Sequence, residues 1–180
     1  PEYIEIMPTF SGYVGGIQYF EESENENSIY HSIYHEVLEE ELKVFETLNH
    51  TYSTNALTHN KLYSFRNAFV NFIVGACLRN LSEGRNFLRP IKYSYIIHID
   101  INKKVHDWIK DLVENLRLGY KEEKEIFKNA IRSSYEQYTN SFSKISPTLP
   151  SLEEVQEYCQ KSLEHIRILK VNSDEDIKVH

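Results

Sequence analysis

Apolar residues recur at three- and four-residue intervals along much of the chain, the spacing that places side chains on one face of an α-helix. The first such run extends from Ile29 to Leu48 and predicts an amphipathic helix that Ser28 can cap. A second run, from Leu62 to about Arg79, is apolar over most of its circumference. It therefore predicts a helix at the centre of a helical layer.

Three further helices are predicted in the second half of the chain. Gly119 is expected to separate the first of them from a charged helix over about residues 121–142. Ser151 and Glu154 form a capping-box signature, which predicts that the last helix begins beside them. The first of the three carries a regular inward stripe, formed by Val105, Trp108, Ile109, Leu112 and Leu116.

Two segments have the composition of β-strands. Residues 93–100 are β-branched and aromatic, as expected of a buried strand, and residues 165–171 alternate between apolar and polar. Three predicted helices separate them, so a parallel pairing with a right-handed crossover is expected rather than a hairpin. Two strands alone leave exposed edges, and the chain lacks an initiator Met, so we expect a fragment whose sheet a larger protein completes.

The predicted fold class is therefore α/β and predominantly helical, a helical insertion combined with a small parallel sheet. An irregular lead-in over residues 1–20 and the first helices occupy residues 1–90, and a βαααβ unit occupies residues 91–180. The 180 residues are enough for one compact core.

Composition narrows the function classes. A net charge of −7 and a pI of about 5.6 leave no basic stripe of the kind that an autonomous duplex-binding domain carries, so any nucleic-acid contact must be local. Two cysteines are too few for a disulfide framework, which favours reduced thiols in a cytoplasmic protein. No apolar run is long enough to cross a bilayer, so no membrane partner is expected.

Two groups of side chains have metal-binding spacings. His31 and His35 are four residues apart, as two zinc ligands on a helix can be, but a solvated polar face is the favoured interpretation. Asp174 with Asp176 and Lys178 superficially resembles the carboxylate and lysine set of a Mg²⁺-dependent nuclease. A surface turn after the last strand is favoured there, so no catalytic residue and no metal site is assigned.

The end of the first predicted strand is the strongest functional candidate. The candidates are Ser94, His98 and Asp100. His98 and Asp100 share one side of the pleat, and open α/β sheets place their ligands at the carboxyl ends of strands. A structural histidine remains the favoured role for His98. Several cations surround this junction and are candidate contacts for a DNA backbone, with a solvated rim as the alternative: Arg79, Arg85, Arg89, Lys92, Lys103 and Lys104.

Two sequence runs carry a family resemblance. Residues 64–81, SFRNAFVNFIVGACLRNL, followed by residues 94–99, SYIIHI, resemble in order and spacing the helix and the Ser-Met-Leu-Ile-His strand of the Z-one endonuclease domain family. Residues 13–20 resemble the Tyr-x-Gly segment of that family, and residues 168–173 resemble its hydrophobic-Asn-Ser segment. The resemblance thus extends over nearly the whole chain.

The resemblance implies a place within a superfamily-two helicase-like motor of restriction-modification and DNA-defence proteins. The helices would be an insertion between the two motor halves, and residues 91–180 would belong to the second RecA-like domain. ATP and Mg²⁺ would be bound by the parent, an ATP-dependent DNA-processing hydrolase, with the remainder of the motor and DNA as partners.

This chain is expected to bind no cofactor and to be inactive alone, since it contains no Gly-Lys-Ser/Thr phosphate loop. A self-contained helical protein-interaction module is the alternative.

Overall fold

The computed structural model describes residues 15–31, 35, 37–47, 50–97, 103–142 and 149–170. The chain forms two compact units, residues 1–35 and residues 36–180. In the first unit, a short helix, α1 (Gly16–Phe20), precedes the 3₁₀ turn η1 (Glu22–Glu24). This helix corrects the expectation of an irregular lead-in up to Phe20.

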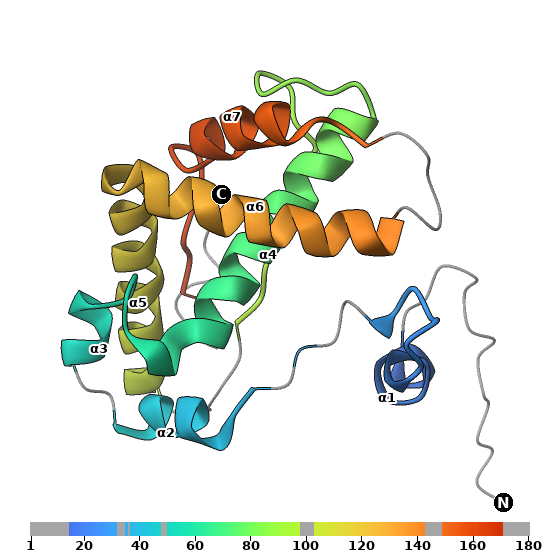
Figure 1. The fold of residues 1–180 in the computed structure, drawn as a ribbon. Helices are drawn as coiled ribbons and strands as arrows, with labels where there is room; N and C mark the ends of the chain where they lie inside the picture. The colour runs from blue at the N-terminus through green and yellow to red at the C-terminus, as the bar shows by residue number, and fades with distance from the viewer. Residues whose placement is uncertain are drawn as a thin grey trace, which may run out of the picture. The chain divides into compact units, whose positions relative to one another are not determined.

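The second unit is a packed group of helices (Figure 1). Its elements lie in the chain order α2 (Glu39–Thr47), α3 (His50–Thr54), the 3₁₀ turn η3 (Asn60–Leu62), α4 (Tyr63–Ser82), α5 (Lys103–Glu122), α6 (Lys124–Phe142) and α7 (Leu152–Ser162).

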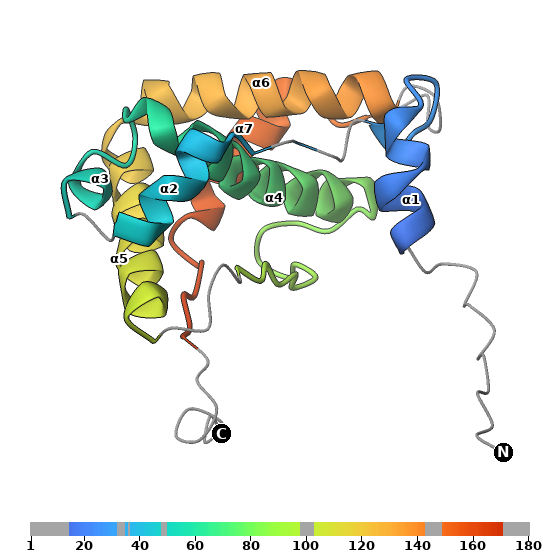
Figure 2. The ribbon, with the colours of Figure 1, turned by 90° about the horizontal axis from the view of Figure 1, so that it is seen from below.

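Helix α4 is the centre of the unit, as its apolar circumference predicts. It packs against both α6 and α7, and the two views show α6 on one side of α4 and the segment that follows α4 on the other (Figures 1 and 2). The buried residues of α4 are Phe69, Val70, Ile73, Val74, Cys77, Leu78 and Asn80.

Among the described helices, none combines the length and the apolarity needed to cross a bilayer.

Helix α5 continues through Gly119, so the predicted break at this residue is wrong. A Cβ at Gly119 would lie 2.7 Å from Leu57 Cδ1, which is closer than packed carbon atoms approach. The glycine therefore provides space for Leu57 instead of ending the helix. The inward stripe predicted for α5 is confirmed, because Val105, Trp108, Ile109, Leu112 and Leu116 are all buried.

Two carboxylates cap helix N-termini. The predicted capping box of α7 is confirmed: Glu154 N donates to Ser151 Oγ at 3.3 Å, and Ser151 N donates to Glu154 Oε2 at 2.8 Å. The start of α4 is capped by a residue distant in sequence, since Ser64 N and Oγ both donate to the Glu41 carboxylate, at 2.8 and 2.5 Å. The negative charge of Glu41 also lies at the positive end of the α4 dipole.

The helix predicted over residues 29–48 is wrong in its first half. Within the described residues, α2 begins only at Glu39, and Val37 and Leu38 are exposed. A short helix is stable only where it buries an apolar face, and these two residues have no such partner surface.

The predicted parallel sheet is also wrong, because the described part of the chain contains helices and connecting segments but no strand. Residues 91–97 cross α4 as a single segment, and Asn80 of that helix binds the backbone of Ile91. Side chains after α7 pack on helices instead of on a sheet: Ile166 and Ile168 join the helical core, and Lys170 Nζ lies 2.6 Å from Asp107 Oδ1 on α5. The RecA-like domain expected for residues 91–180 is therefore not supported.

Tyr120 makes the stability of the helical core sensitive to alkaline pH. Burial raises the pKa of Tyr120 from 10.0 to about 12. A raised pKa means that the neutral phenol stabilises the fold fully below pH 10, and that this contribution disappears as the pH rises towards 12. Two pKa units correspond to roughly 2–3 kcal/mol. Denaturant unfolding between pH 9 and 12 is expected to show this loss, and Tyr120→Phe should make the loss smaller.

Candidate functional site

Asn80 fixes the chain that leaves α4. Its side chain is buried, and its amide accepts a hydrogen bond from Ile91 N at 2.6 Å and donates to Ile91 O at 3.1 Å and to Ala76 O at 2.9 Å. The amide thus pairs with both backbone groups of Ile91, as a neighbouring strand would. A polar residue at the end of the apolar run that begins at Leu62 was the signal for this contact, and the sequence reasoning missed it.

The end of α4 turns into the loop with a Schellman arrangement. Gly84 N donates to Leu81 O at 2.9 Å, and Arg85 N donates to Asn80 O at 2.8 Å. Gly84 has a φ of +66°, a conformation that costs other residues steric strain. The direction in which the loop leaves the helix is therefore determined by backbone contacts.

Residues 84–92, here named the basic loop, are anchored on α7. The Phe87 ring lies 6.3 Å from the Tyr158 ring and 4.8 Å from the His165 ring, measured between centroids. Within the loop, Asn86 Oδ1 accepts hydrogen bonds from Leu88 N and Arg89 N at 3.0 and 3.2 Å. The loop is thus held by Asn80 of α4 and by its own residues Asn86 and Phe87, while its other side chains face solvent.

Cations project from this anchored loop. Arg85, Arg89 and Lys92 are exposed, and in the part of the chain that the structure describes none of them enters an ion pair. From Gly84 to Ile99 the sequence contains no Asp or Glu, although the whole chain has a net charge of −7. The basic loop is therefore a local positive region on an acidic protein.

The other predicted backbone contacts lie outside the loop. Arg79 is in the last turn of α4, where its Nε lies 2.7 Å from Glu83 Oε1, so a neighbouring carboxylate compensates its charge. Lys104 is exposed in the first turn of α5, and the side chain of Lys103 lies outside the described residues. Of the six cations predicted, the structure brings Arg85, Arg89 and Lys92 together in one loop.

The predicted strand-end site is described only in part. Ser94 is exposed on the segment that crosses α4, whereas His98 and Asp100 lie outside the described residues. The grouping of these three residues stays a prediction.

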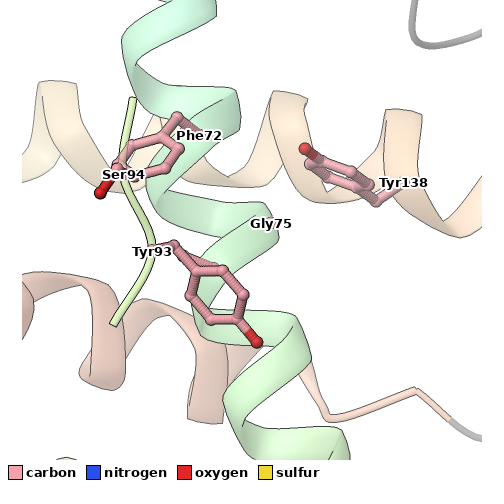
Figure 3. Close-up of a pocket in the computed structure, with 6 residues that line it drawn as sticks. Phe72, Gly75, Tyr93, Ser94 and Tyr138 are labelled. Carbon is pink, nitrogen blue, oxygen red and sulfur yellow. The ribbon is translucent and has the colours of Figure 1, made fainter. Parts of the chain in front are cut away.

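Ser94 lies beside a hollow of about 250 Å³ that opens to solvent between α4, α6 and the crossing segment. Figure 3 shows the rings of Phe72, Tyr93 and Tyr138 arranged around Gly75. Apart from Ser94, the walls of the hollow are aromatic, and its floor consists of the small residues Gly75 and Ala76. The lining residues are Phe72, Gly75, Ala76, Tyr93, Ser94 and Tyr138.

The small floor of the hollow is required by Tyr138. A Cβ at Gly75 would lie 2.6 Å from Tyr138 Oη and 3.1 Å from its Cζ, so any larger residue must displace the phenol. Tyr138 Oη donates to Asn71 O at 2.9 Å, which fixes the ring, and burial raises its pKa. Phe72 is covered on one side by Tyr95, whose ring stacks on it with centroids 5.2 Å apart.

The sequence pattern places Phe72 within the apolar run that begins at Leu62 and Tyr138 within the charged helix over residues 121–142, and it does not predict the hollow. Both are only partly buried, at the edge of the core. Gly75 within an otherwise apolar helix was the available signal, since a glycine there favours close approach by another element.

The structure gives no support to a zinc site at His31 and His35. His31 Nδ1 lies 2.7 Å from Ser23 O, a local contact within the first unit, and neither histidine lies in an α-helix of the described residues. Within the described ranges, no three His, Cys, Asp or Glu side chains gather closely enough to hold a metal ion. Asp174, Asp176 and Lys178 lie outside those ranges.

Comparison with known proteins gives one match. The family model of the Z1 domain, the Z-one family of the sequence resemblance, matches residues 64–180. No curated protein matches the chain, and no solved structure matches it. The match begins in the first turn of α4 and includes the basic loop and every residue that lines the hollow. Since it covers more than half of the chain, this protein belongs to the Z1 domain family.

Proposed function

We propose that this Z1 domain is a non-catalytic unit of an ATP-dependent, helicase-like restriction protein, and that it contacts the DNA backbone through the basic loop. ATP and Mg²⁺ would be bound by other parts of the parent protein, because this chain lacks a Gly-Lys-Ser/Thr loop. The remainder of the motor would be its protein partner, and its place of action would be the cytoplasm.

The charge of the basic loop is the observation that supports this proposal. Phosphate contacts require exposed cations, and three of them, Arg85, Arg89 and Lys92, project from a loop that is fixed at several points. A fixed loop loses little conformational entropy when it binds, so its cations can contribute more of their attraction to affinity. The acidic remainder of the chain would restrict the contact to this region.

Neutralising the loop tests the proposal. The triple variant Arg85→Ala, Arg89→Ala and Lys92→Ala is expected to bind a fluorescein-labelled DNA duplex at least tenfold more weakly than the native chain at low salt. Fluorescence anisotropy titration measures this affinity, with several unrelated duplexes because backbone contacts carry no sequence information.

A second triple variant, Lys110→Ala, Lys124→Ala and Arg132→Ala, is the matched control. These cations are also exposed, and their removal changes the net charge equally, but they lie on α5 and α6. The proposal expects the control to bind within about threefold of the native chain. An equal loss of affinity for the duplex in both triple variants would show a general charge effect and would refute a specific contact by the loop.

A helical protein-interaction module is the second candidate, and exposed apolar side chains favour it. Leu88, in the basic loop, is 82% exposed, and Ile96, on the crossing segment, is 84% exposed. Large apolar side chains in such positions are typical of surfaces that another protein covers. Failure of the native chain to bind any duplex, together with saturable binding to another part of the parent protein, would favour this candidate over the first.

A further inference from the structure

We propose that the aromatic hollow receives one unstacked base of a single-stranded DNA segment while the basic loop holds the adjoining phosphates. This proposal rests on the function proposed above and extends it, since it names the form of DNA and the site of base contact.

The dimensions and walls of the hollow fit a single flat ring. Its volume of about 250 Å³ is below the roughly 300–1,000 Å³ that is usual for pockets binding drug-sized molecules. Proteins that bind single strands without sequence preference use aromatic side chains as stacking platforms, because every base has a π face. Tyr93 is the candidate platform, since this residue is 40% exposed, whereas Phe72 is already stacked against Tyr95.

Positive charge adjoins the hollow on the side of the basic loop. Lys92 is the sequence neighbour of Tyr93 and belongs to the basic loop. Arg79 lies four residues after Gly75 on α4, one helical turn beyond the floor of the hollow, but its charge is compensated by Glu83. A base in the hollow would therefore place its own phosphates beside the uncompensated cations of the basic loop.

The polar groups of the hollow are compatible with any base. Ser94 and Tyr93 have hydroxyls that can donate or accept, and Tyr138 Oη already donates to Asn71 O. A tyrosine is neutral near pH 7 at its ordinary pKa, and burial raises the pKa of Tyr138 further, so this phenol adds no charge that would repel a phosphate. Shape and stacking, rather than base-specific hydrogen bonds, would therefore dominate, and weak sequence preference is expected.

Replacing the platform tests the proposal. Tyr93→Leu keeps an apolar side chain but removes the π face, and it is expected to weaken binding of a single-stranded 12-mer roughly 5- to 150-fold, as loss of one stacked base does. Tyr93→Phe keeps the face and should bind within about twofold of the native chain. The probe is a thymidine 12-mer that contains one 2-aminopurine, whose fluorescence reports unstacking and stacking of that base.

Tyr63→Leu is the control, because Tyr63 is also exposed, at the start of α4, and lies outside the hollow. Ala76→Leu provides a second variant, which fills the floor of the hollow while the Tyr93 side chain is kept, and it too is expected to weaken single-strand binding. Thermal unfolding of each variant verifies that the fold is retained.

The outcomes separate this proposal from the one on which it rests. One outcome is that the native chain binds the 12-mer, that neutralising the basic loop lowers this affinity, and that Tyr93→Leu and Ala76→Leu leave it unchanged. This outcome would refute the base site and leave the backbone contact standing. If neither the 12-mer nor a duplex binds the native chain, both proposals are refuted. The base site is supported if Tyr93→Leu and Ala76→Leu lower the affinity for the 12-mer and Tyr63→Leu does not.

Discussion

Replacing Phe127 with Ala is expected to lower the free energy of unfolding of the helical unit by about 3–5 kcal/mol, the usual effect of truncating a large core side chain. Phe127 has no exposed surface, and its ring centroid lies 4.8 Å from that of Tyr120. Tyr120 in turn is stacked parallel to Phe69, with centroids 6.4 Å apart. The truncation would therefore leave a cavity where α4, α5 and α6 meet.

Chemical denaturation followed by the fluorescence of Trp108 measures this loss. Trp108 is the one tryptophan in the sequence and is buried on α5, so it reports on the core without interference. Ile126→Ala is the control, because Ile126 precedes Phe127 on the same helix and is 38% exposed. Ile126→Ala should lower the free energy of unfolding by well under half as much as Phe127→Ala. Equal losses in the two variants would contradict the assignment of Phe127 to the core.

Replacing Asn80 with Ala is expected to lower the free energy of unfolding by about 2–4 kcal/mol. Three hydrogen bonds of its amide are lost, and Ile91 N and O lose their partner at a partly buried position. The effect should be concentrated on the segment after α4, because the amide is the direct hydrogen-bond link between α4 and Ile91. Hydrogen exchange at the Ile91 amide is therefore expected to accelerate more than exchange in α5.

Asn115→Ala is the matched control for this substitution. Asn115 is an exposed asparagine within α5, where Ala has the higher helix propensity, so the change should be neutral or slightly stabilising. If Asn80→Ala were as mild as Asn115→Ala, the side-chain pairing with Ile91 would contribute little to the fold. The orientation of the basic loop would then need another explanation.

The helices could be predicted from sequence where local and tertiary signals agree. The periodic stripe of α5, the apolar circumference of α4 and the capping box at Ser151 all have direct counterparts in the structure. Gly119 was misleading because a glycine has two uses: it can end a helix, or it can admit a neighbouring side chain such as Leu57. Only the tertiary contact decides between them.

The predicted strands failed because β propensity depends on context. Residues 93–97 have the aromatic and β-branched composition of a strand, yet Tyr95 stacks on Phe72, and the neighbouring Ile91 is bound by a side chain of α4. A local pattern cannot reveal that a helix provides the partner. The hollow was missed for a similar reason, since Phe72 and Tyr138 come from helices that are far apart in sequence.

The cations of the basic loop were predictable as residues but not as a group. Six were proposed around one junction, and nothing in the sequence indicated that Glu83 would pair with Arg79 while Arg85 and Arg89 would remain unpaired among the described residues. Anchoring by Phe87 on α7 also depends on tertiary packing. The structure thus reduces the candidate interface to one loop and the segment that follows it.

The salt dependence of duplex binding tests the proposed backbone contact most directly. Each phosphate contact contributes roughly 0.9 to the slope of log affinity against log salt concentration, so loss of Arg85, Arg89 and Lys92 is expected to reduce the slope by about 2.7. Titrations between about 50 and 200 mM salt would measure the slopes of the native chain, the loop variant and the control variant with Lys110, Lys124 and Arg132 replaced. A lower slope for the loop variant alone is the expected result, and equal slopes for all three proteins would contradict a DNA contact by the basic loop.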